Sequence, residues 1–438
     1  MRWIYNFGFF LFAFFSLPHF LKRLGQADDP VRSVKERLGI FPRETVSRFR
    51  TQHPVWVHAV SVGEVLAVEK FLHLLLKERP GLQVVLTTVT PTGQRIAKSW
   101  ESGRLSVFYF PFDFRFAVRR FFQTFKPKLL LLVETEIWPN VIREARTRGI
   151  PVGIVNGRLS EKSFRAFKRF HWIFAPVFKS VTFFLVQTEK NRARWVELGV
   201  SPEKVTVTGN MKLDALDWEG HREKEREPLR EAWGIQATDQ VLMGGSTHPG
   251  EDEMLLRVLR LLREERVPLK LVLAPRHVER SRRILEEVRR EGFRGILMSE
   301  AAPSPPSYDV LILDKLGELR KLYLAADVVV MGGSFVPHGG QNPAEPAVTG
   351  RALLHGPWVF NFEELYQRLG EAGGSLRIDG EPQLILTLKR ILPNRAERQT
   401  MGRRAFEVLE KLRGATQRNL HFIEPFLKTT KGVPAHVG

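Results

Sequence analysis

Short, wholly apolar runs alternate with amphipathic stretches along almost the entire chain. Between the runs, apolar residues recur at three- and four-residue spacing, for example over residues 64–77, which predicts helices there. Strands that are apolar on both faces and separated by helices are typical of parallel sheets covered on both sides. We therefore expect an α/β architecture with strands at residues 55–59, 84–88, 107–110, 129–133, 152–155, 183–187, 205–208, 241–244, 271–274, 295–298, 310–313, 328–331 and 352–355.

The length of the chain and one interruption of this rhythm predict two domains. A chain of 438 residues is long for a single domain, and the alternation breaks near residues 213–227. We expect a doubly wound, Rossmann-like domain over residues 24–215 and a second one over residues 216–428, facing each other across a cleft. A polar tail, residues 429–438, is expected to be disordered.

Residues 3–21 form a continuous apolar segment with seven phenylalanines and no formally charged side chain. As a helix, this segment would extend about 28 Å, close to the bilayer core of about 30 Å. Pro18 leaves open whether such a helix spans the membrane or lies in its interface. A cleaved signal peptide is the rival interpretation, but residues 25–27 match a cleavage site poorly. We predict an uncleaved anchor, residues 1–23, and the basic residues after it favour a cytoplasmic location for the rest.

The charge balance indicates anionic partners. Lys and Arg total 67 against 48 Asp and Glu, which gives a net charge of +19 and a pI near 10.3. Nucleic acid, an anionic membrane surface and a phosphorylated substrate would all fit this balance. No nucleic-acid-binding pattern occurs, so no nucleic-acid partner is expected. The absence of cysteine excludes disulfides and thiol catalysis.

Residues 162–179 are a second candidate for membrane contact. One face of a helix over this segment would be aromatic, and the basic residues would lie largely opposite. The aromatic face comprises Phe164, Phe167, His171, Phe174 and Phe178. The alternative is a core-facing helix with a solvated basic side, interrupted at Pro176. Because an anchor is expected at the N-terminus, we favour the membrane interpretation.

Polar and glycine-rich sequences directly follow several predicted strands, where open parallel sheets bind ligands. Glu64 begins a helix after the first strand, and Glu134 and Glu136 end the fourth strand. In the second half, the glycine-rich residues 332–340 precede Glu345. Glycines let a ligand approach the backbone, and amides at a helix start favour an anion. The alternative is that each carboxylate merely complements a helix dipole.

Metal binding is not expected. His248 and His277 lie after predicted strands, but no H-E-x-x-H or D-x-D pattern completes a site around them. No cofactor motif is present either: Gly244 and Gly245 lack the lysine of a phosphate-binding loop.

Ten short strings, in order from about residue 60 to about residue 350, together resemble a known family. They are VSVGE (60–64), TTVTPTG (87–93), YFPFD (109–113), ETEIWPN (134–140), NGRLS (156–160), GNMKLD (209–214), GGST (244–247), APRH (274–277), LGEL (316–319) and GGSFVPHGGQNPAEPA (332–347). The resemblance is to the 3-deoxy-D-manno-octulosonic acid (Kdo) transferases of lipopolysaccharide and lipid A biosynthesis in Gram-negative bacteria.

The resemblance implies a GT-B fold, CMP-Kdo as donor and a bisphosphorylated lipid A precursor (lipid IVA) as acceptor at the inner membrane. It assigns the role of general base to Glu64. It implies CMP-Kdo contacts at Pro275, Arg276, Leu316, Gly317, Glu318, Asn342, Pro343, Ala344 and Glu345. Further substrate contacts are expected within the matching strings at Ser61, Gly63, Glu136, Asn210, Lys212 and Ser246.

We therefore expect an inverting, metal-independent glycosyltransferase whose catalytic domains lie on the cytoplasmic face of the inner membrane. Such a transfer needs a carboxylate within hydrogen-bond reach of the attacking hydroxyl. One alternative is another GT-B enzyme that acts on a nucleotide sugar, such as a 2-epimerase. The other is a non-catalytic membrane protein that binds anionic lipid through its basic face.

Overall fold

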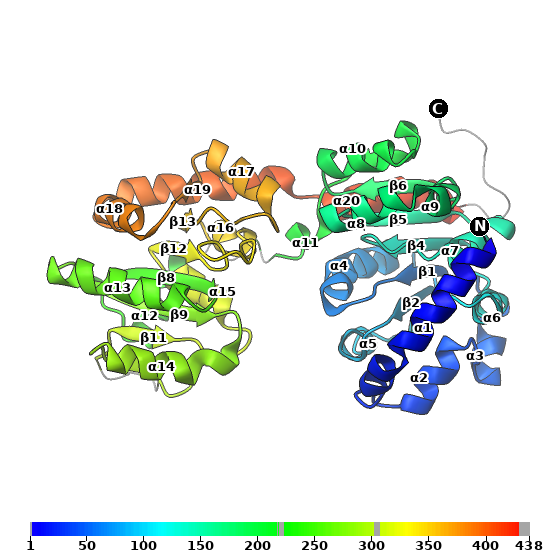
Figure 1. Ribbon diagram of the computed structural model, residues 1–438, viewed down its shortest axis with the longest axis horizontal. Coiled ribbons are helices and arrows are strands. Elements are labelled where there is room, and N and C mark those ends of the chain that lie inside the picture. The colour runs from blue at the N-terminus through cyan, green and yellow to red at the C-terminus, as the bar shows by residue number, and fades with distance from the viewer. Residues whose placement is uncertain (1, 217, 219–222, 302–306, 429–438) are drawn as a thin grey trace. The chain divides into compact units, whose positions relative to one another are not determined.

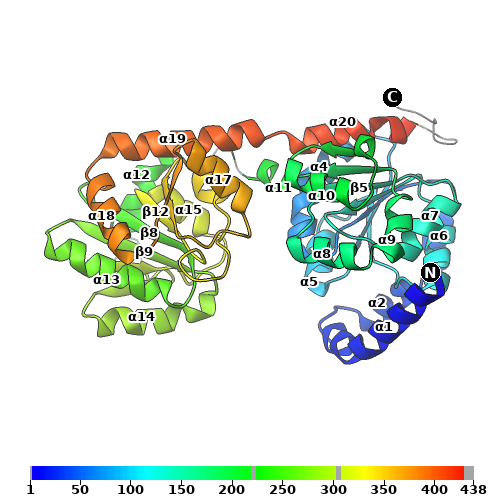
Figure 2. The same cartoon turned by 45° about the horizontal axis from the view of Figure 1, so that its top comes forward.

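The computed structural model describes residues 2–216, 218, 223–301 and 307–428, and the chain divides into two compact units. Unit 1 comprises Met1–Ala215 and Arg413–Gly438, and unit 2 comprises Leu216–Leu412. Each unit has its own sheet with helices on both faces (Figures 1 and 2).

The sheet of unit 1 has seven parallel strands in the order β3-β2-β1-β4-β5-β6-β7. The order proceeds from β1 to β3 on one side and from β4 to β7 on the other, which is the doubly wound pattern. The strands are β1 (Val55–His58), β2 (Val84–Thr88), β3 (Leu105–Tyr109), β4 (Leu129–Val133), β5 (Val152–Gly157), β6 (Phe183–Val186) and β7 (Val205–Val207). Every residue of β1–β6 is buried, as expected for strands that are apolar on both faces.

Helices cover both faces of this sheet and bury two apolar clusters. Trp56 stacks on Phe121 at 4.2 Å in one cluster, and Phe71 and Leu72 lie in the other. The helices are α1 (Arg2–Leu24), α2 (Pro30–Arg37), α3 (Arg43–Arg48), α4 (Val62–Glu78), α5 (Pro91–Lys98), α6 (Arg115–Phe125), α7 (Pro139–Thr147), α8 (Glu161–Arg169), α9 (His171–Phe178), α10 (Glu189–Glu197), α11 (Met211–Asp214) and α20 (Ala415–Lys428).

Unit 2 repeats the architecture with a sheet in the order β10-β11-β9-β8-β12-β13-β14, again parallel. Its strands are β8 (Gln240–Thr247), β9 (Leu269–Pro275), β10 (Gly295–Leu297), β11 (Val310–Ile312), β12 (Val328–Met331), β13 (Ala352–His355) and β14 (Ser375–Arg377). Its helices are α12 (Glu223–Ala232), α13 (Glu251–Glu264), α14 (Ser281–Arg290), α15 (Leu319–Ala325), α16 (Ala344–Val348), α17 (Glu363–Glu371), α18 (Glu381–Ile391) and α19 (Arg395–Leu412).

The predicted fold of two doubly wound sheets is confirmed, and all thirteen predicted strands are present. Strand β14 was not predicted, because it has only three residues and one buried side chain.

The segment 162–179 packs into unit 1, and the favoured membrane interpretation of its aromatic face was wrong. The segment forms two helices that part at Phe170, not one continuous helix. Phe178 is fully buried, and its ring meets Trp195 at 5.3 Å. Phe164, Phe167 and Phe174 pack against the same cluster. The aromatic face therefore belongs to the core, and it is Phe170 and Trp172 that point outward.

Helix α20 belongs to unit 1, whereas residues up to 428 were predicted to lie in the second domain. Leu420 and Ile423 lie in the core cluster that also contains Leu72 of α4. Phe422 and Phe426 pack on Phe183 of β6 with ring distances of 5.0 and 4.9 Å. An amphipathic pattern shows that a helix has an apolar face, but it does not show which sheet that face covers. The expected disordered tail, residues 429–438, lies outside the described residues.

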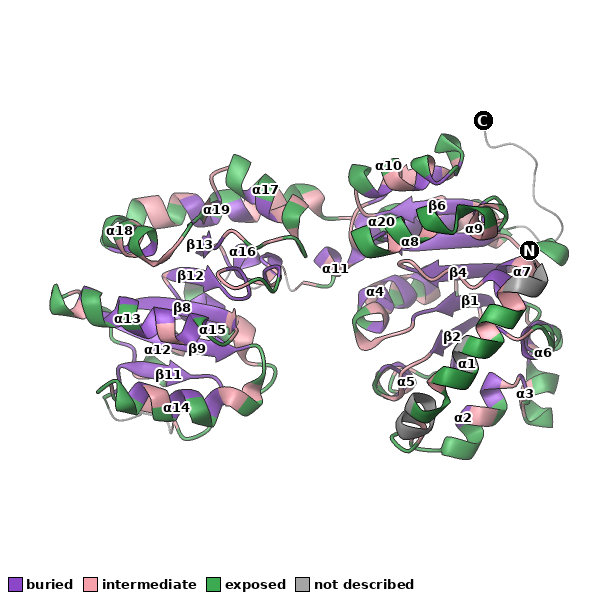
Figure 3. Ribbon diagram, viewed as in Figure 1, coloured by how far each residue is buried: buried purple, intermediate pink, exposed green. Residues whose placement is uncertain are grey.

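Helix α1 lies along unit 1 with one face against it and the other exposed (Figure 3). Phe9 packs on Phe114 at 5.1 Å, and Tyr5 donates a hydrogen bond to Asp113. Phe7, Phe14 and Phe15 are 65%, 62% and 76% exposed. Within the described part of the chain, no helix combines the length and the apolarity needed to cross a bilayer.

Candidate active site

The two strands in the middle of the unit 1 sheet bring the predicted carboxylates together. β1 and β4 are neighbours, but the chain continues from them in opposite directions, which makes their carboxyl ends a topological switch point. Doubly wound sheets bind their ligands at such points. Glu64 follows β1, and Glu134 and Glu136 follow β4, so all three residues lie at this point.

Glu64 lies in the first turn of α4 and is partly exposed. Its carboxylate accepts hydrogen bonds from the Val60 amide at 2.8 Å and the Ser61 hydroxyl at 2.9 Å. Burial raises the pKa of Glu64 and the charge of Glu134 adds to this, although the two hydrogen bonds and Lys212 act in the opposite direction. A carboxylate of raised pKa that solvent still reaches is suited to accept a proton.

Glu136 is more strongly perturbed than Glu64. Burial raises the pKa of Glu136 to about 8, and the charges of Glu64 and Glu134 contribute. The indole N–H of Trp138 donates to its carboxyl at 2.9 Å and acts in the opposite direction. Glu136 therefore carries a proton at neutral pH, while Glu134 forms an ion pair with Lys212 at 2.7 Å. The site thus holds one neutral and one paired carboxyl beside Glu64.

The other predicted residues of unit 1 surround this group. Ser61 is the N-cap residue of α4, and a Cβ atom added to Gly63 would meet no atom within 4 Å. Asn210 caps α11 by accepting from the Lys212 amide at 3.0 Å, which places Lys212 beside Glu134. Asn156 was not predicted as a site residue. It is fully buried, and its side-chain oxygen accepts from the Met211 amide at 2.9 Å. Its position in the NGRLS string directly after an apolar run was the available signal.

The switch point of unit 2 lies between β8 and β12, and a buried carboxylate organises its loops. Glu251, in the first turn of α13, accepts four backbone hydrogen bonds of 2.7 to 3.0 Å. The donors are the amides of His248, Gly333, Ser334 and Phe335. A Cβ atom on Gly332 would come within 2.2 Å of the Ser246 carbonyl oxygen. The first part of the glycine-rich loop therefore packs around the Glu251 carboxylate and against the loop after β8. Glycine is required at position 332 because the backbone of Ser246 leaves no room for a side chain.

Asp252, next to Glu251, connects the end of β8 to the segment that follows β9. Its buried carboxylate accepts from the Thr247 hydroxyl at 2.5 Å and forms an ion pair with Arg280. The Thr247 carbonyl oxygen accepts from the Arg276 amide at 3.0 Å. Neither acidic residue was among the predicted site residues, because two carboxylates in a first helical turn are also what dipole complementation produces.

The predicted donor-binding residues lie at the carboxyl ends of β9, β11 and β12. Pro275 ends β9 and Arg276 follows it, exposed to solvent. Leu316 is 84% exposed beside Gly317, which has a φ of +89°, and Glu318 pairs with Lys321 at 2.8 Å. Ser246 also has a positive φ, of +57°.

The second half of the glycine-rich loop leads into α16. Asn342 accepts from the Ala344 amide at 3.1 Å, and Pro343 occupies the N-cap position of α16. Burial raises the pKa of Glu345, and the nearby Arg276 and Arg320 lower it. The structure thus brings Arg276 and Glu345, which are 69 residues apart, into electrostatic contact.

Three histidines border the same loop. His248 stacks on His338 at 4.2 Å, and its ring is 6.3 Å from that of His277. Burial and these histidines lower the pKa of His248 to about 4, so its ring is neutral at physiological pH. Among residues 2–216, 218, 223–301 and 307–428, no group of three or more His, Cys, Asp or Glu is arranged to hold a metal ion.

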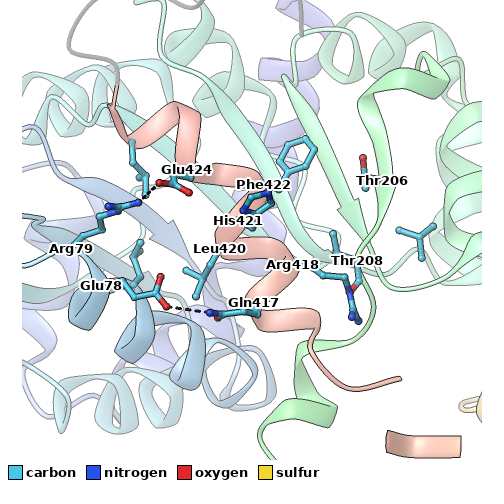
Figure 4. Close-up of a pocket in the computed structure, with 13 residues that line it drawn as sticks. Glu78, Arg79, Thr206, Thr208, Gln417, Arg418, Leu420, His421, Phe422 and Glu424 are labelled. Carbon is cyan, nitrogen blue, oxygen red and sulfur yellow. Dashed lines mark hydrogen bonds and ion pairs between the residues drawn. The ribbon is translucent and has the colours of Figure 1, made fainter. Parts of the chain in front are cut away.

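A pocket of about 560 Å³ lies elsewhere in unit 1, between α20, the end of α4 and the edge strand β7 (Figure 4). Arg79 and Glu424 pair on one side of it, and Arg418 and Thr208 lie on another. Leu75, which lines the pocket, is 11 residues from Glu64 along α4, or about 16 Å at 1.5 Å per residue. This pocket is therefore separate from the carboxylate cluster.

Comparison with known proteins finds matches to one family over most of the chain. The family model described as "3-Deoxy-D-manno-octulosonic-acid transferase (kdotransferase)" matches residues 32–215. The 3-deoxy-D-manno-octulosonic acid transferase of Bordetella pertussis is 33% identical over 384 residues, which cover 85% of this chain and 87% of the relative. The chain belongs to the Kdo transferase family. The Haemophilus influenzae 3-deoxy-D-manno-octulosonic acid transferase is 32% identical over 85% of this chain and 87% of its own length.

Membership of the Kdo transferase family confirms the predicted enzyme class, a glycosyltransferase of lipopolysaccharide biosynthesis. Among solved structures, the UDP-GlcNAc 2-epimerase of Neisseria meningitidis aligns with a TM-score of 0.59, covering 86% of this chain and 100% of that one. At 14% identity this likeness shows the fold alone. The GT-B fold is therefore confirmed, and this likeness gives no support to the epimerase alternative beyond the fold.

Proposed function

We propose that the chain transfers Kdo from CMP-Kdo to a sugar hydroxyl of a bisphosphorylated lipid A precursor, with inversion and without a metal ion. Glu64 is the general base of this reaction. The observation that carries the proposal is the Glu64 carboxyl group, partly exposed at the unit 1 switch point with a raised pKa. The resemblance to the Kdo transferase family also assigns this role to Glu64, the last residue of the string VSVGE.

The transfer moves one proton and breaks one bond to the sugar. The acceptor oxygen forms a bond to the anomeric carbon of Kdo, and its proton goes to the Glu64 carboxylate. The bond between that carbon and the CMP phosphate oxygen breaks, and CMP leaves with the electron pair. Removal of the proton during attack is worth a factor of about 10² to 10⁴ in rate.

The neutral carboxyl of Glu136 supports this role. If Glu136 were ionised, its charge would lie beside Glu64 and raise the cost of keeping Glu64 ionised as a base. With its proton in place, Glu136 presents a hydrogen-bond donor to the site. Lys212 balances the charge of Glu134, so the cluster stays close to a single negative charge.

Unit 2 holds the donor in this proposal. The Arg276 guanidinium is exposed and is suited to bind the CMP phosphate or the Kdo carboxylate. Gly317 has an open position where a Cβ atom would meet nothing within 4 Å, so a ligand has access to the backbone there. Glu345 accepts hydrogen bonds from the ribose or the base. The loop amides at 333–335 donate to Glu251, so the phosphate contacts are assigned to Arg276 and not to these amides.

Replacement of Glu64 by Gln tests the base. We expect E64Q to lower kcat for Kdo transfer by at least about 10², with CMP-Kdo affinity within about threefold of wild type. The assay contains CMP-Kdo, a lipid A precursor and EDTA, and product is identified by mass. E69Q, on the same helix, is the control. A rate for E64Q near that of wild type would exclude Glu64 as base, and lipid binding with no CMP release in any variant would support the non-catalytic alternative.

We further propose that α1 holds the enzyme at the anionic surface of the inner membrane, with both units on the cytoplasmic face. Tyr5 and Phe9 face unit 1, so the exposed phenylalanines of the opposite face are free to enter a lipid interface. The net charge of +19 adds attraction to anionic lipid. The same surface would bring the enzyme close to its acceptor.

Flotation with vesicles that contain anionic lipid tests this attachment. We expect the double variant F10S/F14S to lose most vesicle binding, because both side chains are exposed on α1. L386S removes a similarly exposed apolar side chain from unit 2 and should bind like wild type. Equal binding by the wild type and F10S/F14S would show that α1 is not the main contact.

A further inference from the structure

The inward face of α1 contacts a buried polar group. The Tyr5 hydroxyl donates a hydrogen bond to the Asp113 carboxylate at 2.7 Å, and the Asn6 side-chain oxygen accepts from the Asn140 side chain at 2.8 Å. These two contacts join the start of the chain to residues more than 100 positions away. Phe7, Phe14 and Phe15 of α1 take no part in these contacts and are exposed.

Asp113 is fully buried, and it caps α7 from outside that helix. Its carboxylate accepts from the Asn140 amide at 3.1 Å and from the Val141 amide at 3.0 Å, which are free donors of the first helical turn. The Asn140 side chain also donates to the Asp113 carbonyl oxygen at 2.5 Å. Burial raises the pKa of Asp113 to about 6, so above that pH the carboxylate is ionised and accepts from the Tyr5 hydroxyl and from the Asn140 and Val141 amides.

The first turn of α7 directly follows the carboxylate segment, residues 134–138. The Trp138 carbonyl oxygen accepts from the Ile142 amide at 2.9 Å, which ties Trp138 to the capped turn. The Trp138 indole N–H donates to the Glu136 carboxyl at 2.9 Å. The path from Tyr5 to Glu136 is therefore a continuous series of hydrogen bonds and one helical turn.

We propose that Tyr5 and Asn6 are positioning residues of the transferase: through Asp113 and Asn140 they hold the carboxylate segment in place beside Glu64. This inference rests on the proposed function, in which that segment is part of the active site. It gives α1 a second role, because a helix that contacts lipid on one face also supports the active site with the other. Loss of α1 contacts then lowers the rate even in detergent solution, where membrane recruitment does not limit the reaction.

Tyr5→Phe tests this role, since it keeps the ring and removes only the hydroxyl. The loss of one buried hydrogen bond is worth about 1 kcal/mol, or about fivefold. We expect backbone hydrogen exchange over residues 134–141 to become about fivefold faster, measured by mass spectrometry on the full chain. Transfer in detergent should show kcat lowered by about fivefold with KM for CMP-Kdo unchanged. Exchange in the buried strands of unit 1 should stay at the wild-type rate, which distinguishes this local effect from general destabilisation.

Tyr308→Phe is the matched control, because the Tyr308 hydroxyl is also buried and donates to the Trp233 carbonyl oxygen at 2.6 Å within unit 2. It should leave exchange at residues 134–141 unchanged. Asn6→Ala is a second variant that should act in the same direction as Tyr5→Phe. Unchanged exchange or unchanged kcat in both α1 variants would overturn the inference, as would an equal effect of Tyr308→Phe. If the wild type shows no transfer, the proposed function fails, and exchange alone still decides whether α1 holds the segment.

Discussion

The surroundings of the Glu136 carboxyl group favour its protonated form. The side chain is largely removed from water, and two other carboxyls lie close enough to disfavour a further negative charge. The sequence predicted Glu136 as a site residue, because it follows an apolar strand in a matching string. Its proton could not be predicted, because the depth of burial depends on Trp138 and on the packing of Phe110 and His58 around that ring.

The raised pKa of Glu136 predicts a loss of stability with rising pH. Its pKa is about 8 in the folded protein against 4.5 for the ordinary value. Between these values the unfolded chain releases a proton that the folded protein keeps, so the contribution is complete below pH 4.5 and lost as the pH rises through about 8. Between pH 5 and pH 9, the free energy of unfolding of E136Q should therefore fall by about 2 to 4 kcal/mol less than that of the wild type. Thermal unfolding of wild type and E136Q at pH 5 and pH 9 measures it, and parallel pH dependences would contradict the assignment.

At the scale of elements, the glycine-rich loop after β12 is shaped mainly by one side chain. Four amides donate to Glu251, and the close approach of the β8 loop requires glycine at position 332. From the sequence, this loop was expected to leave room for the nucleotide. In the structure, the amides in the first part of the loop are bonded to Glu251 and are not available to a nucleotide. Only residues from about 339 onward lead to the predicted contacts at Asn342 and Glu345.

Replacement of Glu251 by Gln should therefore weaken donor binding without removing the fold. The amide group has one acceptor oxygen in place of two, and its NH₂ would face backbone N–H donors, a mismatch worth about 1 to 3 kcal/mol. We expect the affinity for CMP, measured by calorimetry, to fall by about tenfold. E264Q, at the exposed end of the same helix, is the control. Wild-type affinity in E251Q would show that the loop is not part of the donor site.

At the scale of the whole molecule, the chain leaves unit 1 and returns to it at one buried point. Asp214 is the last residue of α11, and its carboxylate accepts from the Gly414 amide at 2.7 Å and the Thr416 amide at 2.5 Å. Lys70 of α4 donates to the Asp214 carbonyl oxygen at 2.9 Å. The Asp214 carboxylate therefore caps α20. It also joins the segment where the chain leaves unit 1 to the segment where the chain returns.

Loss of this cap should loosen α20 from unit 1. We expect Asp214→Ala to destabilise unit 1 by about 1 to 2 kcal/mol, the usual cost of losing an N-cap side chain. Limited proteolysis should then cut near residues 413–416 faster than in wild type. Asp379→Ala removes an exposed carboxylate of unit 2 and should not change this cleavage. Equal cleavage rates in D214A and wild type would show that Asp214 does not secure the helix.

The amino-acid sequence alone determined thirteen of the fourteen strands, the two doubly wound sheets and the carboxylates that follow the strands, because burial on both faces requires local apolar runs. The local pattern of residues, without the family resemblance, could not distinguish Glu64 from Glu251. Both are acidic residues in a first helical turn, yet solvent reaches one of them, and the other is enclosed by four amides. Only the tertiary structure decided that α20 completes unit 1 and that Tyr5 meets Asp113, since these contacts join residues far apart in the chain. Such pairings depend on the shape of the folded surfaces, and no local pattern records them.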